Sequence, residues 1–117
     1  MARRRNTRPT LIYWLLDVRP EILVDWPNGL PFYCGKTVLK PSARFAKHRS
    51  DARKNSAREI SKRLIACGDH VKIRIMESVP PGENWAERER FFISSLRLLW
   101  PNTANVTSGG QGMPGHI

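Results

Sequence analysis

The run of six apolar residues at positions 11–16 is the feature that most constrains the fold. It is rich in branched and aromatic side chains, which favour strands, and its length suits a buried strand in a sheet. Asp17 ends the run well before the length that crosses a bilayer, so the basic residues before it do not form a signal peptide. We therefore expect a buried strand, and neither secretion nor a membrane span.

A turn and a second strand follow the apolar run. Pro27, Asn28 and Gly29 supply the chemistry of a turn, and residues 31–37 have the composition of a strand. Residues 21–25 extend the hairpin in this interpretation. The two strands are expected to pair in antiparallel fashion.

Residues 41–67 change to helical character, with a break near Asn55. Ser42 is the expected N-cap of the first helix. Ser56, followed three residues later by Glu59, is typical of a capping box that begins a second helix, and Gly68 is placed to end it.

The last third of the chain predicts one more strand and one more helix. Residues 71–76 alternate apolar with basic side chains, as a half-buried strand does, before prolines end the pattern. Asn84 is the expected N-cap of a helix that continues to about Trp100. The sequence thus predicts an α+β fold, a small three-stranded antiparallel sheet flanked by helices, in the order β-β-α-α-β-α. With 117 residues this is one domain, residues 10–117, preceded by a flexible basic arm, residues 1–9.

The charge of the chain identifies the class of partner. The net charge is +10, and positions 44–63 alone hold eight basic and two acidic residues. Such density favours a surface that binds phosphates, so nucleic acid, DNA rather than RNA, is the expected partner. No stretch joins a basic face to a continuous apolar one, which argues against a membrane surface. Two cysteines are too few for a disulfide scaffold, so we expect a reducing, cytoplasmic setting.

Glu89 is the acidic residue whose position is hardest to explain by solvation. At 100° per residue it lies on the same stripe of the last helix as Trp85, Phe92, Leu96 and Leu99. A carboxylate facing the core needs a cation, an arginine or a water-lined cleft. This pattern alone leaves a structural pair with arginine as plausible as a catalytic role.

Arg44 and His48 are four residues apart, so one face of a helix presents both to the same anion. Tyr33, Gly35 and Lys36 lie at the end of the second strand, where a glycine lets the backbone approach a ligand closely. Taken singly, Tyr13 and Tyr33 are also explained by packing in the sheet.

Together these motifs resemble the GIY-YIG nuclease family over residues 11 to about 112. Tyr13 stands where the family has the tyrosine of Gly-Ile-Tyr, and Tyr33 begins the equivalent of Tyr-Ile-Gly. The remaining matches are, in chain order, Lys36, Arg44, His48, Glu89 and Asn105. The chain departs from the pattern in having Leu11 for the first glycine, Cys34 for the isoleucine, and a longer segment between the two tyrosines.

The resemblance implies a metal-dependent endonuclease that hydrolyses phosphodiester bonds in DNA. Glu89 would hold one magnesium ion, Mg²⁺, replaceable by Mn²⁺, and Asn105 would brace it. Arg44 would clamp the phosphate, while His48 and Lys36 orient water and phosphate. A tyrosine made acidic by nearby cations would be the base, with Tyr13 favoured slightly over Tyr33. Lys47 and Arg49 of the same helix are expected to contact the substrate.

Two other functions fit the charge of the chain. One is a basic module that binds nucleic acid without cutting it, and the other is a structural subunit that binds an acidic protein. Neither explains Glu89 or the ordered tyrosine, arginine and asparagine motifs. A homodimer is possible, since one site cuts one strand at a time.

Overall fold

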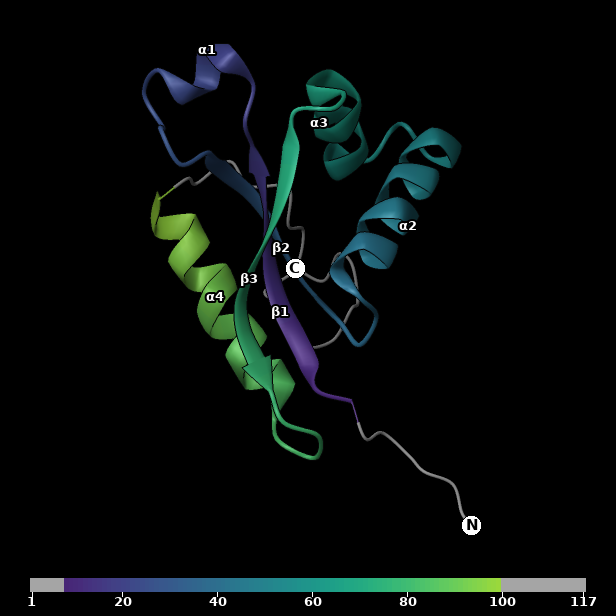
Figure 1. The fold of residues 1–117 in the computed structure, drawn as a ribbon, viewed down its shortest axis with the longest axis vertical. Helices are drawn as coiled ribbons and strands as arrows, with labels where there is room; N and C mark the ends of the chain where they lie inside the picture. Colours follow the sequence, from purple (N-terminus) through teal and green to yellow (C-terminus); the bar gives the residue numbers. More distant parts are fainter. Residues whose placement is uncertain (1–7, 100–117) are drawn as a thin grey trace.

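In the computed structural model, residues 8–99 are described, and the prediction of an α+β fold is confirmed (Figure 1). The elements in chain order are β1 (Thr10–Asp17), α1 (Pro20–Leu23), β2 (Leu30–Thr37), α2 (Pro41–Lys54), α3 (Glu59–Cys67), β3 (Val71–Val79) and α4 (Trp85–Leu99). The three strands form one antiparallel sheet in the order β2-β1-β3. The apolar first strand is therefore the central one, as a run of this composition favours.

The register of the sheet determines which residues share a face. Tyr13 lies opposite Gly35 on β2 and opposite Ile75 on β3, while Trp14 lies opposite Cys34 and Arg74. Because successive side chains in a strand point to opposite faces, Tyr13 and Trp14 belong to different layers of the protein.

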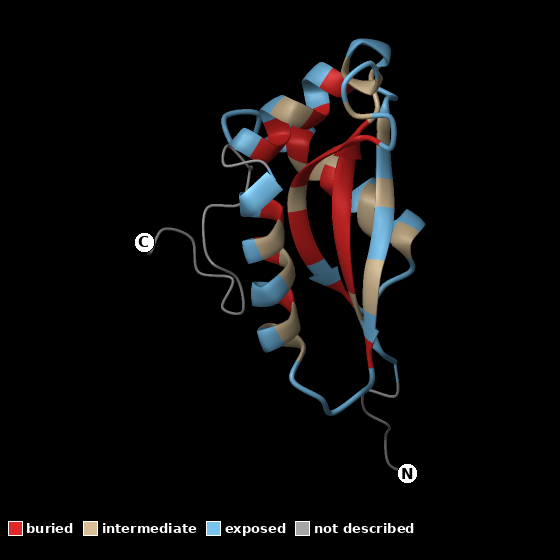
Figure 2. Ribbon diagram, turned by 90° about the vertical axis from the view of Figure 1, so that its left-hand side faces the viewer, coloured by how far each residue is buried: buried red, intermediate tan, exposed pale blue. Residues whose placement is uncertain are grey.

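Each face of the sheet has its own core. On one face, α4 packs against Ile12, Trp14 and Leu16 through Ile93 and Leu96. The other face is covered by α2 and α3, whose buried residues Ala52, Ile60 and Leu64 join Tyr13, Leu15 and Phe32. Figure 1 shows α4 on one side of the strands and the α2–α3 pair on the other. Burial is concentrated in β1 and β2, whereas β3 is mostly exposed or half-buried (Figure 2).

The connection between β1 and β2 differs from the prediction. Residues 21–25, expected to extend the hairpin, instead include most of the short helix α1. Pro20 begins this helix, because its fixed φ suits the first helical turn and its missing N–H is not needed there. The turn at Gly29 is confirmed: its φ of 95° is a conformation that glycine adopts without strain.

The starts of α2 and α3 were also predicted wrongly. Lys40 is the N-cap of α2, with Pro41 in its first turn, and Arg58 is the N-cap of α3, so neither Ser42 nor Ser56 caps a helix. A proline at the first helical position fixes the start one residue before the serine that competes for it. The break at Asn55 is confirmed, and so is the end of α3 at Gly68, whose φ is 60°.

The start of α4 agrees with the sequence. The backbone N–H of Glu87 donates to Oδ1 of Asn84 over 3.1 Å, which is the expected cap. None of the helices described between residues 8 and 99 has the length and apolar character needed to cross a membrane. Most of the expected arm, residues 1–9, and the site asparagine Asn105 lie outside the described residues.

Candidate functional site

Tyr13, Arg44 and His48 form a hydrogen-bonded cluster on the α2 side of the sheet. The Tyr13 hydroxyl lies 2.6 Å from Nε2 of His48, and Nε of Arg44 donates to the same hydroxyl over 3.0 Å. The two α2 residues are one helical turn apart, so both reach the one oxygen, as their spacing predicts. The sequence therefore anticipated the shared face of Arg44 and His48, and the structure identifies the group they share as a tyrosine.

The direction of the Tyr13–His48 hydrogen bond follows from the groups present. Arg44 is only a donor, so it occupies a lone pair of the hydroxyl oxygen, and the hydroxyl proton needs an acceptor. Nε2 of a neutral imidazole is that acceptor within the cluster. His48 is buried, and its burial, followed by the positive charge of Arg44, lowers its pKa to about 4. His48 is therefore neutral at pH 7, and its Nε2 accepts a hydrogen bond from the Tyr13 hydroxyl.

Neither tyrosine has the acidic hydroxyl that the sequence led us to expect. Burial, and then the charge of Tyr33, raise the pKa of Tyr13 although Arg44 opposes them. Burial also raises the pKa of Tyr33, with Arg44 opposing and Glu89 reinforcing the shift. The expectation that nearby cations lower the pKa of a tyrosine was wrong for the protein without ligand. Burial destabilises each phenolate more than the charge of Arg44 stabilises it.

Tyr33 stands next to the cluster and differs from Tyr13 in exposure. Its ring centroid lies 5.3 Å from that of His48 and 6.4 Å from that of Tyr13, both in tilted or edge-on contact. Tyr13 has no exposed surface, whereas Tyr33 is half-buried, and its hydroxyl has no hydrogen bond among residues 8–99. Of the two tyrosines, Tyr33 is thus the one whose side chain is partly exposed.

Gly35 is required by this packing. A Cβ atom added there would lie 2.5 Å from the Tyr13 hydroxyl oxygen and 2.9 Å from a carbon of the Tyr33 ring. The sequence suggested that this glycine admits a ligand. In the structure the space above it is taken by Tyr13, so the glycine serves the cluster itself.

Glu89 approaches from the other side of the sheet. It is 8% exposed on the inner face of α4, along with Ile93 and Leu96, so its place among apolar residues is confirmed. Leu99, assigned to the same stripe, is half exposed. The carboxylate contributes to the raised pKa values of Tyr33 and Cys34, which places its charge in the neighbourhood of β2. Tyr33 thus feels the charge of Glu89 while its ring packs against the cluster.

The remaining expected site residues are more scattered. Lys36 is exposed, with Nζ 4.4 Å from the centre of the Trp85 ring at the start of α4, on the same side as Glu89. Lys47 is exposed on α2. Arg49 points away from the cluster: it donates to the carbonyl of Gly68 and covers the ring of Phe45, which ties α2 to the end of α3.

The donor set around Glu89 fits magnesium held by a single carboxylate. Within residues 8–99 there is no group of three or more His, Cys, Asp or Glu side chains that would build an all-protein metal cage. Magnesium commonly takes one or two carboxylates and completes its shell with water and substrate phosphate oxygens. Glu89 meets that requirement, and Lys36 lies on the same face of the sheet.

Two charged features of the structure were not predicted from the sequence. Arg58, at the start of α3, adds positive charge that acts on both His48 and Tyr33. Asp17 is fully buried and paired with Arg19 at 2.7 Å and with Arg63 at 3.2 Å. An aspartate that ends an apolar run, as Asp17 does, can indicate such a buried ion pair. The position of Arg58, in contrast, depends on how the connection between α2 and α3 folds.

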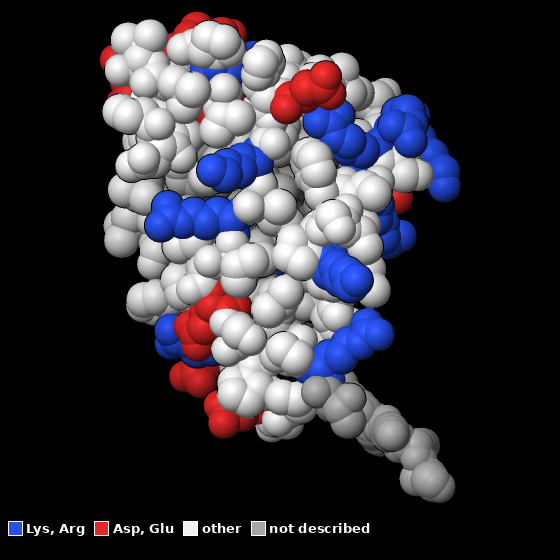
Figure 3. Space-filling model, viewed as in Figure 1, with Lys and Arg blue, Asp and Glu red and all other residues white. Residues whose placement is uncertain are grey.

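Basic side chains are spread over much of the visible surface. Figure 3 shows Lys and Arg over the middle of the sheet and along the α2 side, with acidic groups gathered at the two ends of the molecule. A polyanion would therefore meet positive charge on the flank that carries the tyrosine cluster.

No protein-family model matches the chain, and no curated protein or solved structure is significantly similar to it. The role of the site thus follows from its geometry and from its sequence motifs.

Proposed function

We propose that this protein is a magnesium-dependent endonuclease that hydrolyses phosphodiester bonds in DNA. The observation that supports it most is the Tyr13–Arg44–His48 cluster, against which Tyr33 packs within the electrostatic influence of the buried Glu89 carboxylate. The resemblance to GIY-YIG nucleases and the net charge of +10 point the same way. A module that only binds DNA needs none of these buried polar contacts.

Hydrolysis needs an attacking water that loses a proton, a new oxygen–phosphorus bond, and a leaving sugar oxygen that departs as its bond to phosphorus breaks. Magnesium on Glu89 would stabilise the charge on the phosphate and leaving oxygen, and would favour ionisation of a hydroxyl beside it. Arg44 uses Nε for Tyr13, so its terminal nitrogens are left to hold a phosphate oxygen. Lys36 adds charge from the Glu89 side.

The roles of the tyrosines follow from their exposure. Tyr33, whose side chain is half-buried rather than enclosed, would orient the attacking water and take its proton as a phenolate. Tyr13, fully buried between Arg44 and His48, is a positioning residue that fixes Arg44. This reverses the slight preference for Tyr13 as the base that was expected from the family resemblance.

Replacing Glu89 tests the metal site. Glu89→Gln keeps the shape of the side chain and removes its charge, so magnesium-dependent cleavage of plasmid DNA should nearly vanish while DNA binding persists. Glu87→Gln, at an exposed position two residues away, is the matched control and should cut like wild type.

The melting temperature of Glu89→Gln separates catalysis from structure. A structural ion pair would leave a buried partner uncompensated, at about 3–5 kcal/mol, and the melting temperature would fall. A stable variant that cuts at the wild-type rate would refute the assignment of Glu89. Wild-type protein that binds DNA but never cuts it with magnesium would favour the non-catalytic module.

Replacing each tyrosine by phenylalanine tests the division of roles. Tyr33→Phe should slow single-turnover cleavage by about 10²–10⁴-fold, the usual contribution of a general base. Because the wild-type enzyme acts through the ionised hydroxyl, its rate should rise with pH through the neutral range, and this rise should disappear in Tyr33→Phe. Tyr13→Phe should be slower but keep the pH dependence. Loss of the pH dependence in Tyr13→Phe alone would transfer the role of base to Tyr13.

A further inference from the structure

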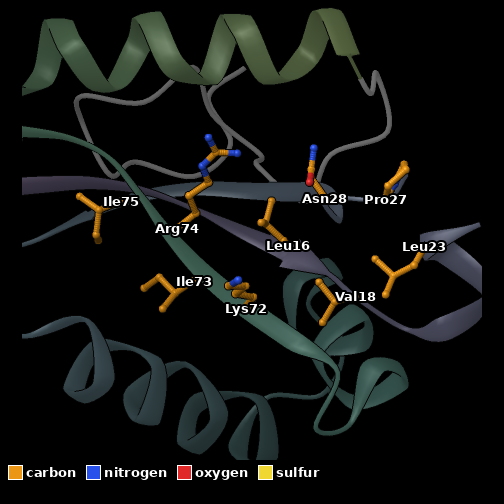
Figure 4. Close-up of a pocket in the computed structure, with 9 residues that line it drawn as sticks. All are labelled: Leu16, Val18, Leu23, Pro27, Asn28, Lys72, Ile73, Arg74 and Ile75. Atoms are coloured by element: carbon orange, nitrogen blue, oxygen red, sulfur yellow. The ribbon is translucent and has the colours of Figure 1, made fainter. Parts of the chain in front are cut away.

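A groove with free positive charge lies away from the tyrosine cluster, where β3 and the end of β1 meet the hairpin that contains α1. Its walls include the apolar residues Leu16, Val18, Leu23 and Pro27, and its polar groups are Asn28, Lys72 and Arg74. Figure 4 shows these residues on β1, β3 and the hairpin, with Arg74 and Asn28 pointing towards α4.

The register of the sheet shows which face carries the two cations of the groove. Lys72 and Arg74 lie opposite Leu16 and Trp14, so they belong to the face that α4 covers. However, α4 packs chiefly on β2 and β1, and within residues 8–99 it covers little of the β3 flank of that face. Both cations are exposed, and neither forms an ion pair with any residue between 8 and 99.

The chemistry of the groove fits a strand of nucleic acid. Alternate residues of a strand are about 7 Å apart, comparable to the separation of neighbouring phosphates, so Lys72 and Arg74 can each meet one phosphate. The apolar walls suit the flat faces of bases, which are exposed only in a single strand. Four successive residues of the edge strand β3 line the groove, and the two that carry charge, Lys72 and Arg74, favour an anion over an added peptide strand.

We propose that this groove binds single-stranded nucleic acid, as a second contact for a substrate that carries an unpaired tail. The inference rests on the proposed nuclease function, since the groove lies on the face of the sheet from which Glu89 reaches the site. Substrates with a single-stranded flap next to a duplex would then be bound more tightly than blunt duplexes.

The test compares affinity for a short duplex with and without an oligothymidine tail, measured in chelator so that no cleavage occurs. In wild type the tailed duplex should bind more tightly. In the groove pair, Lys72→Glu with Arg74→Glu, that preference should fall towards one, and the salt slope for the tailed duplex should drop by about 1.4, or 0.7 for each single-strand phosphate contact. The charge-preserving pair, Lys72→Arg with Arg74→Lys, should behave as wild type.

A second pair with the same change in charge is the matched control. Lys47→Glu with Lys54→Glu alters two exposed residues of α2, seven positions apart on one face. It should weaken binding of both duplexes and leave the preference for the tail intact. If charge reversal lowers the melting temperature of the groove pair, alanine at both positions provides the same comparison.

The outcomes separate this inference from the proposed function. If the groove pair loses the preference for the tail but the wild-type protein never cleaves DNA, the proposed nuclease activity is refuted and the proposed binding of single strands in the groove is supported. If the folded groove pair keeps the wild-type preference for the tailed duplex, the proposal that the groove binds single-stranded nucleic acid is refuted, whatever the cleavage activity. Tighter binding of polyglutamate than of oligothymidine, lost in the groove pair, would also refute it and identify an acidic protein as the occupant.

Discussion

At the residue scale, His48 shows how packing decides a protonation state. The pKa of its imidazole falls from 6.5 to about 4, first through burial and then through the charge of Arg44. Below pH 6.5, therefore, the His48 imidazole is protonated in the unfolded chain but stays neutral in the folded chain. Stability is complete above pH 6.5 and is lost as the pH falls towards 4, by up to about 3 kcal/mol.

This pH dependence can be measured directly. Denaturant unfolding of wild type between pH 7 and pH 4 should show the loss, whereas His48→Gln, which keeps an acceptor and does not titrate, should be much flatter. His70→Gln removes an exposed histidine and should retain the wild-type slope. Equal slopes for His48→Gln and wild type would mean that His48 takes up its proton in the folded protein without cost.

At the scale of elements, the buried pair at Asp17 ties the end of β1 to α3. Its carboxylate has no exposed surface and accepts hydrogen bonds from Arg19 and from Arg63, 46 residues further along the chain. Burial opposes ionisation, but the hydrogen bonds and charge of Arg19 outweigh it, and the pKa of Asp17 is lowered. The pair therefore helps to hold α3 against the sheet.

Asp17→Asn should destabilise the protein by about 3 kcal/mol, because it leaves two partly buried arginines without their counter-charge. Glu59→Gln breaks the exposed i,i+3 pair with Lys62 and should leave the melting temperature close to that of wild type. Thermal unfolding of the two variants tests the contrast. Equal melting temperatures would show that Arg19 and Arg63 are satisfied by water once the charge is gone.

Local patterns account for most of the elements and for only part of the site. The strands, the break at Asn55 and the cap at Asn84 depend on neighbours within a few residues, and the sequence predicted them. Helix starts failed where Pro41 overrode a nearby serine. The spacing of Arg44 and His48 predicts a shared face, but their contact with Tyr13 spans 31 and 35 residues. Only the family resemblance suggested that contact, and the direction of the pKa shifts needed the packed structure.

At the scale of the whole molecule, charge should govern binding. The net charge of +10 includes four arginines in residues 1–9, so log affinity for duplex DNA should fall linearly with log salt, by about 0.9 for each phosphate contact. Replacing those four arginines by glutamine keeps the length of the arm and should flatten the slope. A slope that does not change would show that the arm makes no contact with DNA.

The double burial of β1 also determines where the chain can change in length during evolution. One extra residue inside β1 would exchange its two faces, turning Trp14 towards α2 and the Tyr13 hydroxyl towards α4, so both cores and the cluster would be lost together. Residues 18–29 leave the sheet before β2 begins, and an insertion there shifts no strand residue. The long segment between Tyr13 and Tyr33 is thus compatible with an unchanged site. Homologues are expected to vary in length within this hairpin while the positions along β1 stay fixed.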